Sequence, residues 1–264
     1  ATATITINPV NDAPISSDVT GSGNEGGDIT TTLTATDVDN SDPDSFDFEI
    51  IIDSDNLPIY KDGDVTIGSV SYNSGTFTAI ATYRHDSSEN FSDSFTYKAN
   101  DGSVDSNTST ATLTMTPVND PPVVPTDALA GSGDEGSTIT VTLTATDVDD
   151  NDTPLDMTFS IISQPSYITG SIDESASVTY DAGTGTFSKV VTYTHDDTQT
   201  TSDSFTYKAN DGSSDSNTAT TTITITAVND APVANDVSGS GNEAGTITTT
   251  LTATDVDNST ASDI

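Results

Sequence analysis

The stretch STITVTLTATD, residues 137–147, alternates one apolar residue with one threonine over most of its length. Because successive side chains of a β-strand point to opposite faces, Ile139, Val141 and Leu143 share one face and the threonines share the other. This alternation predicts a half-buried strand of an antiparallel sheet. The same rule holds in ATATITI (1–7), STATLTMT (109–116) and TATTTITIT (218–226). No stretch carries an apolar stripe of helical period, so the sequence predicts an all-β protein.

Whole blocks of sequence recur at an interval near 110 residues. LTATDVD occurs at 33–39, 143–149 and 251–257 (143 − 33 = 110), and SDSFTYKANDGS occurs at 92–103 and 202–213. A unit of this length suits a small Greek-key β-sandwich of about seven strands, and its repetition predicts a linear array. The expected division is a last strand of a preceding repeat (1–11), two sandwich repeats (12–119 and 120–229) and the first strands of an incomplete repeat (230–264).

The charge balance excludes several classes of partner. The chain has 5 Lys and Arg against 42 Asp and Glu, a formal net charge of -37. Nucleic acids and anionic membrane surfaces require a basic patch, so neither is an expected partner. The chain has no Cys, which rules out disulfides and thiolate zinc sites. It also has no apolar run long enough to span a membrane.

The stretch GSGDEG, residues 131–136, matches the glycine pattern of dinucleotide-binding loops. That loop requires a preceding strand and a following helix, whose N-terminus meets the pyrophosphate. Here a Pro-rich linker precedes the glycines, a threonine-rich strand follows, and the Asp-Glu pair would repel phosphate. Related glycines return at 21–26 and 239–245. We therefore expect the glycines to shape a bend that leads into the first core strand.

Acidic residues recur at fixed places in every repeat. The recurring residues are a Glu in the glycine turn (Glu25, Glu135, Glu243), a D-x-D pair (Asp37/Asp39, Asp147/Asp149, Asp255/Asp257), the Asp of ANDG (Asp101, Asp211), and an Asn-Asp pair between repeats (Asn11/Asp12, Asn119/Asp120, Asn229/Asp230). Hard oxygen ligands in this number favour Ca²⁺. An EF-hand over residues 37–48 is excluded because Asp42 and Phe48 stand where that loop needs Gly and Glu, and no helices flank it.

A turn Glu followed in order by A-x-D-x-D, A-x-D-G and V-N-D-x-P resembles the cadherin repeat. The residues of these motifs are most similar to those in the cadherin-like tandem repeats of giant bacterial surface adhesins. The resemblance covers the whole chain. It implies Ig-like/cadherin-like sandwiches with Ca²⁺ bound between successive domains. The ligand set implied near 117–121 is Glu25, Asn119, Asp120, Asp147, Asp149 and Asp211, and the set implied near 227–231 is Glu135, Asn229, Asp230, Asp255 and Asp257.

The resemblance also has departures. Asp86 and Asp196, in YRHD and YTHD, occupy about the place of the family's D-R-E motif, but neither copy keeps that motif. The first Asp of the family's linker is replaced by Pro or Ala. We therefore expect fewer ions at each junction than in animal cadherins. His85 and His195 lie one repeat apart and are expected to be structural.

No catalytic motif is present, so the chain is not expected to be an enzyme. The function expected is that of a structural extender in a long extracellular or cell-surface repeat protein of the bacterial adhesin or biofilm type. Its partners would be calcium, the neighbouring repeats, and further copies or a surface ligand. Two alternatives remain open: a glycan- or protein-binding module of a secreted protein, and a building block of an extracellular filament. The aromatic residues that a glycan site would use in the variable middle of the repeats are Tyr60, Tyr72, Tyr167 and Tyr180.

Overall fold

The computed structural model describes residues 1–51, 64–126, 129–149 and 156–257. The chain divides into two compact units, Ala1–Val118 and Asn119–Ile264. In the described residues the helical structure is limited to one 3-10 turn, η1 (Pro43–Ser45), and the rest of the regular structure is β. No helix in these parts of the chain has the length and apolarity that crossing a bilayer requires. The predicted all-β class is confirmed.

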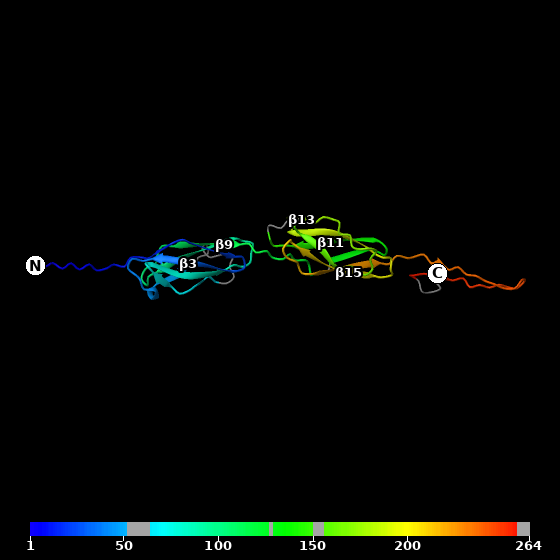
Figure 1. Cartoon of the computed structure of the whole chain (residues 1–264), viewed down its shortest axis with the longest axis horizontal. Coiled ribbons are helices and arrows are strands. Elements are labelled where there is room, and N and C mark those ends of the chain that lie inside the picture. Colours follow the sequence, from blue (N-terminus) through cyan, green and yellow to red (C-terminus); the bar gives the residue numbers. More distant parts are fainter. Residues whose placement is uncertain (52–63, 127–128, 150–155, 258–264) are drawn as a thin grey trace. The chain divides into compact units, whose positions relative to one another are not determined.

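Unit 1 consists of two packed sheets (Figure 1). The first has the order β1 (Ile15–Ser16), β3 (Asp28–Thr36), β7 (Thr76–Arg84) and β5 (Thr66–Ile67), with β6 (Ser71–Asn73) also paired to β7. The second has the order β2 (Val19–Asn24), β9 (Ser109–Thr116), β8 (Ser92–Asn100) and β4 (Asp47–Ile50).

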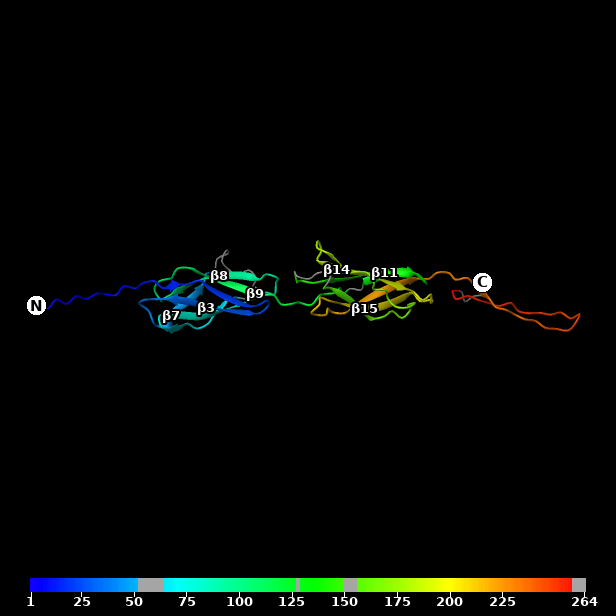
Figure 2. The same ribbon diagram turned by 45° about the horizontal axis from the view of Figure 1, so that its top comes forward.

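Unit 2 repeats this architecture (Figure 2). One sheet has the order β10 (Leu129–Asp134), β16 (Ala219–Thr226), β15 (Ser202–Asn210) and β12 (Thr158–Ser163). The other has the order β11 (Thr138–Thr146), β14 (Thr186–Thr194) and β13 (Thr179–Asp181). Two short strands, β17 (Val233–Ala234) and β18 (Ala253–Thr254), pair with each other near the end of the unit.

The period-two pattern selects the buried face of each strand. In β11 the apolar positions predicted to face inward, Ile139, Val141 and Leu143, are all buried, while the threonines between them are exposed or half-buried. Phe205 and Tyr207 of β15 meet them in one core. Burying these faces removes apolar surface from water and is the main favourable contribution to folding.

One strand pair in each unit departs from the antiparallel expectation. β2 runs parallel to β9, and β10 runs parallel to β16. Parallel neighbours need a long crossover, and here the rest of the domain is that crossover. As a result the end of the first long strand lies beside the end of the last one, and the Glu25 N–H donates to the carbonyl of Thr116 at 3.0 Å. The turn Glu therefore sits where the chain leaves the unit.

The glycine bend was only partly predicted. Gly131 and Gly133 are not in a bend but inside β10, where a Cβ would lie 2.8 Å from Val141 Cγ2 and 2.5 Å from Ile139 Cγ1 respectively. They are glycines because β10 packs against β11 too closely for a side chain. Only Gly136 has a left-handed backbone (φ 67°), and it makes the turn.

Residues 1–11, expected from the sequence to be the last strand of a preceding repeat, are not paired with any described strand. The structure has no strand before Ile15, and Ile5 and Ile7 are each 86% exposed. No described strand pairs with this segment, and an unpaired backbone does not form a sheet. The repeat boundaries proposed from the sequence stay predictions.

Candidate metal centres at the ends of the units

Five of the predicted ligands of unit 1 lie together in one group, here called its aspartate cluster: Asn11, Asp12, Asp37, Asp39 and Asp101. Asp37 follows β3 directly, and its Oδ1 accepts the N–H of Asp39 and of Asn40, both at 2.8 Å. These bonds fold the DVD loop back on itself. Asp39 Oδ2 in turn accepts the N–H of Asp12 at 2.6 Å, so the incoming chain is tied to the loop.

Asp101 anchors the other side of the cluster. Its Oδ2 accepts from Asn11 Nδ2 at 2.8 Å, while its Oδ1 accepts the N–H of Ser103 and of Val104 at 2.7 and 2.8 Å. The Asn11 amide, followed by the Val104 N–H, lowers the pKa of the Asp101 carboxyl, which is therefore charged at neutral pH. Three aspartates from two segments, the DVD loop and the loop of Asp101, are thus hydrogen-bonded to or lie beside the two linker residues Asn11 and Asp12.

One oxygen of this cluster has no hydrogen-bond donor. Asp37 Oδ2 is buried and has no hydrogen-bond partner in the described structure. A cavity of about 290 Å³ is lined by Asp12, Ala13, Ile15, Thr36, Asp37 and Val38. A buried carboxylate oxygen that no donor satisfies is costly, and a cation would satisfy it.

The aspartate cluster of unit 2 consists of Asn119, Asp120, Asp147, Asp149 and Asp211, and it repeats the same bonds. Asn119 Nδ2 donates to Asp211 Oδ2 at 3.0 Å, and the Asp120 N–H donates to Asp149 Oδ2 at 3.0 Å. Burial raises the pKa of Asp211, but donors led by the Ser214 N–H outweigh it, so that the pKa is lowered. Within unit 2 these hydrogen bonds bring the linker residues Asn119 and Asp120 to Asp211 and Asp149, and their role as metal ligands stays a prediction.

A third aspartate cluster, Asn229, Asp230, Asp255 and Asp257, lies further along unit 2. The Asp230 N–H donates to Asp257 Oδ2, and the Asp257 N–H donates to Asp255 Oδ1 at 2.9 Å. Asn229 Nδ2 donates to the Asp230 carbonyl at 2.8 Å. The pKa of Asp230 is raised, first by burial and then by the charges of Asp257, Asp197 and Asp255. Several negative charges are therefore grouped closely around Asp230.

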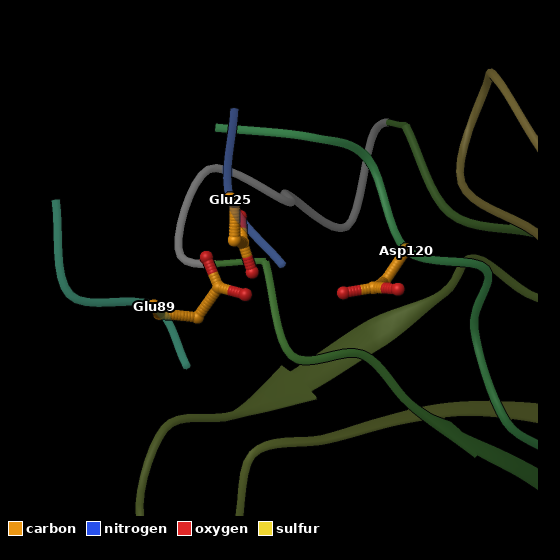
Figure 3. A group of neighbouring side chains, drawn as sticks. All are labelled: Glu25, Glu89 and Asp120. Atoms are coloured by element: carbon orange, nitrogen blue, oxygen red, sulfur yellow. The ribbon is translucent and has the colours of Figure 1, made fainter. Parts of the chain in front are cut away.

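The turn Glu of unit 1 lies at what we call the exit turn, the turn beside which the chain leaves the unit. Glu25 is 7% exposed, and its Oε2 accepts the Val118 N–H at 3.2 Å. Its Oε1 is buried without a hydrogen-bond partner, and a Glu89 carboxylate oxygen lies within 4.8 Å of a Glu25 one. Figure 3 shows these two carboxylates turned toward each other. Asp120, also labelled there, belongs to the second unit and is described with it.

The exit turn of unit 2 is built on Glu135. Its Oε2 accepts the Val228 N–H at 3.3 Å, and its Oε1 accepts from Gln199 Nε2. Gln199 Nε2 also donates to Asp230 Oδ2 at 3.2 Å. The third aspartate cluster and the Glu135 carboxylate are therefore neighbours around one amide.

The two histidines support the exit turns, as the sequence suggested. His85 Nδ1 accepts the Gly26 N–H and His195 Nδ1 accepts the Gly136 N–H, both at 3.3 Å. Both rings are buried. Each ring thus fixes the turn that carries the buried Glu.

The remaining candidates have other surroundings. Asp86 Oδ1 accepts the Ser88 N–H at 3.1 Å, and Asp196 Oδ1 accepts the Thr198 N–H at 3.2 Å, so both carboxylates organise a tight turn. Bonds to Ser88 are the main cause that lowers the pKa of Asp86. Glu243 is exposed.

Sequence reasoning missed Glu89 and Gln199. They lie one repeat apart (199 − 89 = 110) and each contacts or approaches the buried Glu of its unit. Their different residue types hid the recurrence, although the shared interval could have revealed it.

A family model decides the classification. The model described as bacterial Ig domain matches residues 11–116 and again residues 119–224. The chain belongs to the bacterial Ig domain family. Its tandem bacterial Ig domains are thus an extracellular type of repeat module, in keeping with the fold recognised from the sequence.

Solved structures similar to these bacterial Ig domains include cadherin repeats. Mouse cadherin-23 EC22-24 is 19% identical over 94% of this chain and 78% of its own, with a TM-score of 0.54. The extracellular cadherin domains 1–5 of protocadherin gamma B2 are 19% identical over 94% of this chain, with a TM-score of 0.53. The protocadherin gammaB7 EC3-6 cis-dimer is 18% identical over 93%, with a TM-score of 0.51. This chain spans 47% and 56% of the two protocadherin chains, so the likeness shows the fold alone. No curated protein matches the sequence.

Proposed function

We propose that this chain is a structural extender segment of a long extracellular protein of the bacterial adhesin or biofilm type, whose repeats are stiffened by Ca²⁺. The observation that supports it is the group around Asp230. There Glu135 from the exit turn, the linker residue Asp230, and Asp257 from the next aspartate cluster are joined through one amide and one N–H. A linker residue that is hydrogen-bonded to residues before it and after it in the chain, as Asp230 is, favours a stiff tandem array.

Calcium fits the donor set. The groups are carboxylates and amide or backbone carbonyls, which are the hard oxygen ligands that Ca²⁺ takes in sets of about 6–8. The chain as a whole offers almost no competing cations, since Lys and Arg number 5 against 42 acids. Bound Ca²⁺ would neutralise the charges that raise the pKa of Asp230 and lock the linker against both neighbours. By repetition of the same motifs, the proposal extends to residues 117–121.

The environment fits as well. Extracellular calcium modules work with dissociation constants of about 10⁻⁴–10⁻³ M, which matches calcium levels outside cells. We propose an extracellular or cell-surface location and a non-catalytic role in attachment.

The test uses the whole chain in Ca²⁺, in Mg²⁺ and in chelator. We expect Ca²⁺ to raise the melting temperature and to reduce the spread of end-to-end distances measured by small-angle scattering, with a smaller effect of Mg²⁺. An Asp257→Asn variant should lose part of the response, whereas Asp236→Asn, which removes an exposed acid outside the three aspartate clusters, should keep it. Identical curves in calcium and chelator would refute the proposal.

The alternatives give different outcomes. Binding of the chain to a glycan array would favour a recognition module; Tyr167 and Tyr180 are 38% and 44% exposed, Tyr72 packs on Phe77, and Tyr60 lies outside the described residues. Concentration-dependent fibres under the electron microscope would favour a filament subunit.

A further inference from the structure

Two of the chain's five basic residues occupy the same place in successive repeats. Lys98 and Lys208 are separated by one repeat (208 − 98 = 110), and no other pair of Lys or Arg is. Each stands three residues before a predicted ligand, Asp101 or Asp211, in the repeated stretch SDSFTYKANDGS. A basic residue that recurs there in a chain with 42 acids is a candidate for a role at that ligand.

The loop after β8, residues 101–105 and here called the ANDG loop of unit 1, is closed by Asp105. The Oδ2 atom of Asp105 accepts from Lys98 Nζ at 2.8 Å, and its Oδ1 accepts from Asn100 Nδ2 at 2.6 Å. Lys98 and Asn100 lie two residues apart on β8 and so share one face of the strand. The Asp105 side chain therefore holds the end of the loop against that face.

The closed loop fixes the direction of Asp101. Its Oδ1 accepts the N–H of Ser103 and of Val104 at 2.7 and 2.8 Å, and its Oδ2 accepts from the linker residue Asn11 at 2.8 Å. The two N–H donors belong to the loop that Asp105 closes. The Lys98–Asp105 pair thus acts on the predicted ligand through the backbone of the loop.

Unit 2 repeats this arrangement in its own ANDG loop, residues 211–215. Asp215 Oδ2 accepts from Lys208 Nζ, and Asp215 Oδ1 accepts from Asn210 Nδ2 at 2.9 Å. Asp211 Oδ1 again accepts two N–H groups of the loop, at 2.6 and 2.7 Å. The same bonds around the same residue types in both units indicate that they serve the predicted ligand.

The Lys–Asp pair is too exposed to contribute much to the stability of the fold. In unit 1 the side chains of Lys98 and Asp105 are 27% and 47% exposed, and such surface pairs are weak. Lys98 also pairs with Glu49 at 3.1 Å, whereas Ser160 lies opposite Lys208, so only the contact with the loop Asp is common to both units. A positive charge beside a cation ligand would by itself weaken cation binding. The recurrence of Lys therefore indicates a role in geometry that outweighs its charge.

We propose that Lys98 and Lys208 are positioning residues of the first two aspartate clusters. Lys98 closes the ANDG loop through Asp105 and so presents Asp101 to the cation, and Lys208 does the same in unit 2. Because the loop is closed before the ion arrives, less of the binding free energy is spent on ordering it. The identity of the ion as Ca²⁺ rests on the proposed function.

A calcium titration of the whole chain, followed by hydrogen exchange, tests each loop separately. Peptides that span Val104 or Ser214 differ in mass, so the two loops are distinguished although SDSFTYKANDGS occurs in both. We expect Lys98→Met to shift the midpoint of calcium protection in the unit-1 loop to about three- to tenfold higher calcium, because less of the chain is in the binding-competent form. The unit-2 loop of the same sample should stay within about twofold of its original midpoint.

A second measurement, in chelator, follows the position of the loop without the ion. There Lys98→Met should lower the protection of the Ser103 and Val104 amides by about threefold or more, because the loop is open more often. Lys98→Arg keeps a charged donor for Asp105 and should restore both the midpoint and the protection.

Two further variants serve as matched controls. Lys208→Met should move the unit-2 loop and leave the unit-1 loop unchanged. Lys189→Met removes an equal charge from a pair with Glu174 at 3.9 Å, away from both ANDG loops, and should change neither. Circular dichroism checks that each variant is folded.

The outcomes separate the two proposals. If the unmodified chain shows no calcium response in exchange or calorimetry, the proposed function fails, and the measurement in chelator still decides whether Lys98 closes the loop. If calcium binds but the midpoint of Lys98→Met is unchanged or lower, Lys98 acts at most through its charge and only the positioning role is overturned. Failure of Lys98→Arg to restore the midpoint would also count against that role.

Discussion

The middle of each sandwich and its ends are held together by different interactions. In the middle, one face of every long strand is apolar and buried, and the other carries mainly threonine, as in β11, where Thr138 and Thr194 hydroxyls meet at 3.0 Å. At the ends, carboxylates are grouped closely, and Asp37 Oδ2 and Glu25 Oε1 are buried without a hydrogen-bond partner.

This difference divides stability into two parts. Apolar burial and strand pairing require no ion, whereas grouped carboxylates repel one another until a cation or a donor joins them. We expect changes in the middle to be insensitive to calcium and changes at the ends to depend on it. The predictions below test that division, beginning with the largest effect.

Truncating the core should cost the most. Phe205 is 1% exposed in the unit-2 core. Phe205→Ala leaves a cavity and should lower the free energy of unfolding of unit 2 by about 3–5 kcal/mol, equally in calcium and in chelator. Denaturant titration followed by tyrosine fluorescence measures it. Phe95→Ala, the matched variant one repeat earlier, should act on unit 1 instead. If the loss of free energy of unfolding were smaller in chelator than in calcium, the core would not be independent of calcium as expected.

A buried carboxylate that is satisfied by the protein's own donors should not depend on calcium, unlike the carboxylates of the aspartate clusters. Asp203 is 9% exposed and accepts the N–H of Ser166 and of Tyr167 at 3.0 and 2.8 Å, and the Tyr193 hydroxyl at 2.9 Å. Burial alone would raise the pKa of Asp203, but these donors lower it. The folded pKa is thus below the unfolded value, so its stabilisation is complete above about pH 4 and is lost as pH falls through the folded pKa.

Asp203→Asn should therefore lower stability at neutral pH by about 2–3 kcal/mol, because the donors lose a charged acceptor. It should also flatten the decline of stability below about pH 4. Thermal unfolding between pH 2 and pH 7 shows both effects, with Asp236→Asn as the control for removing one charge. If the decline of stability below about pH 4 were the same in the variant, this role of Asp203 would be ruled out.

The next largest loss of stability is expected where β10 packs closely on β11. A Cβ at Gly133 would lie 2.5 Å from Ile139 Cγ1, inside the core. Gly133→Ala should cost about 1–2 kcal/mol through overpacking, with no dependence on calcium. At Gly68 the nearest atom to a Cβ is Ile80 O at 3.5 Å, so Gly68→Ala should be neutral or slightly stabilising. Equal effects of the two substitutions would show that the close approach is not what requires glycine.

The strands and their faces were predictable from the sequence because the signal is carried by side chains with period two. Ile139, Val141 and Leu143 were assigned to the buried face and are 2%, 2% and 0% exposed. The parallel pairing of β10 was not predictable, since Gly131 and Gly133 carry no side chain for a periodic pattern to use. Their role depends on the distance to another strand, which composition does not encode.

The aspartate clusters were predictable for a different reason. Asn119 and Asp211 lie far apart in the sequence but recur together in each repeat, and the structure joins them by a 3.0 Å hydrogen bond. Glu89 and Gln199 were missed because the repeats differ at that position. Only their shared interval of 110 residues marked them in the sequence, and an interval between unlike residues is a weaker signal than a repeated motif.

The smallest effect should change sign with calcium. Burial, followed by the charges around it, raises the pKa of Asp230, so the ionised form costs stability in the absence of a cation. For an acid whose folded pKa is raised, that cost is absent at low pH and appears as pH rises above the unfolded value of about 4. Asp230→Asn should therefore raise the melting temperature slightly at pH 7 in chelator, because one repelling charge is removed. In Ca²⁺ the same substitution removes a ligand and should lower the melting temperature relative to the unmodified chain. Paired thermal scans in both buffers, with Asp236→Asn alongside, measure the crossover. A shift of the same sign in both buffers would mean that Asp230 is a solvated turn residue and that the third aspartate cluster does not bind the ion.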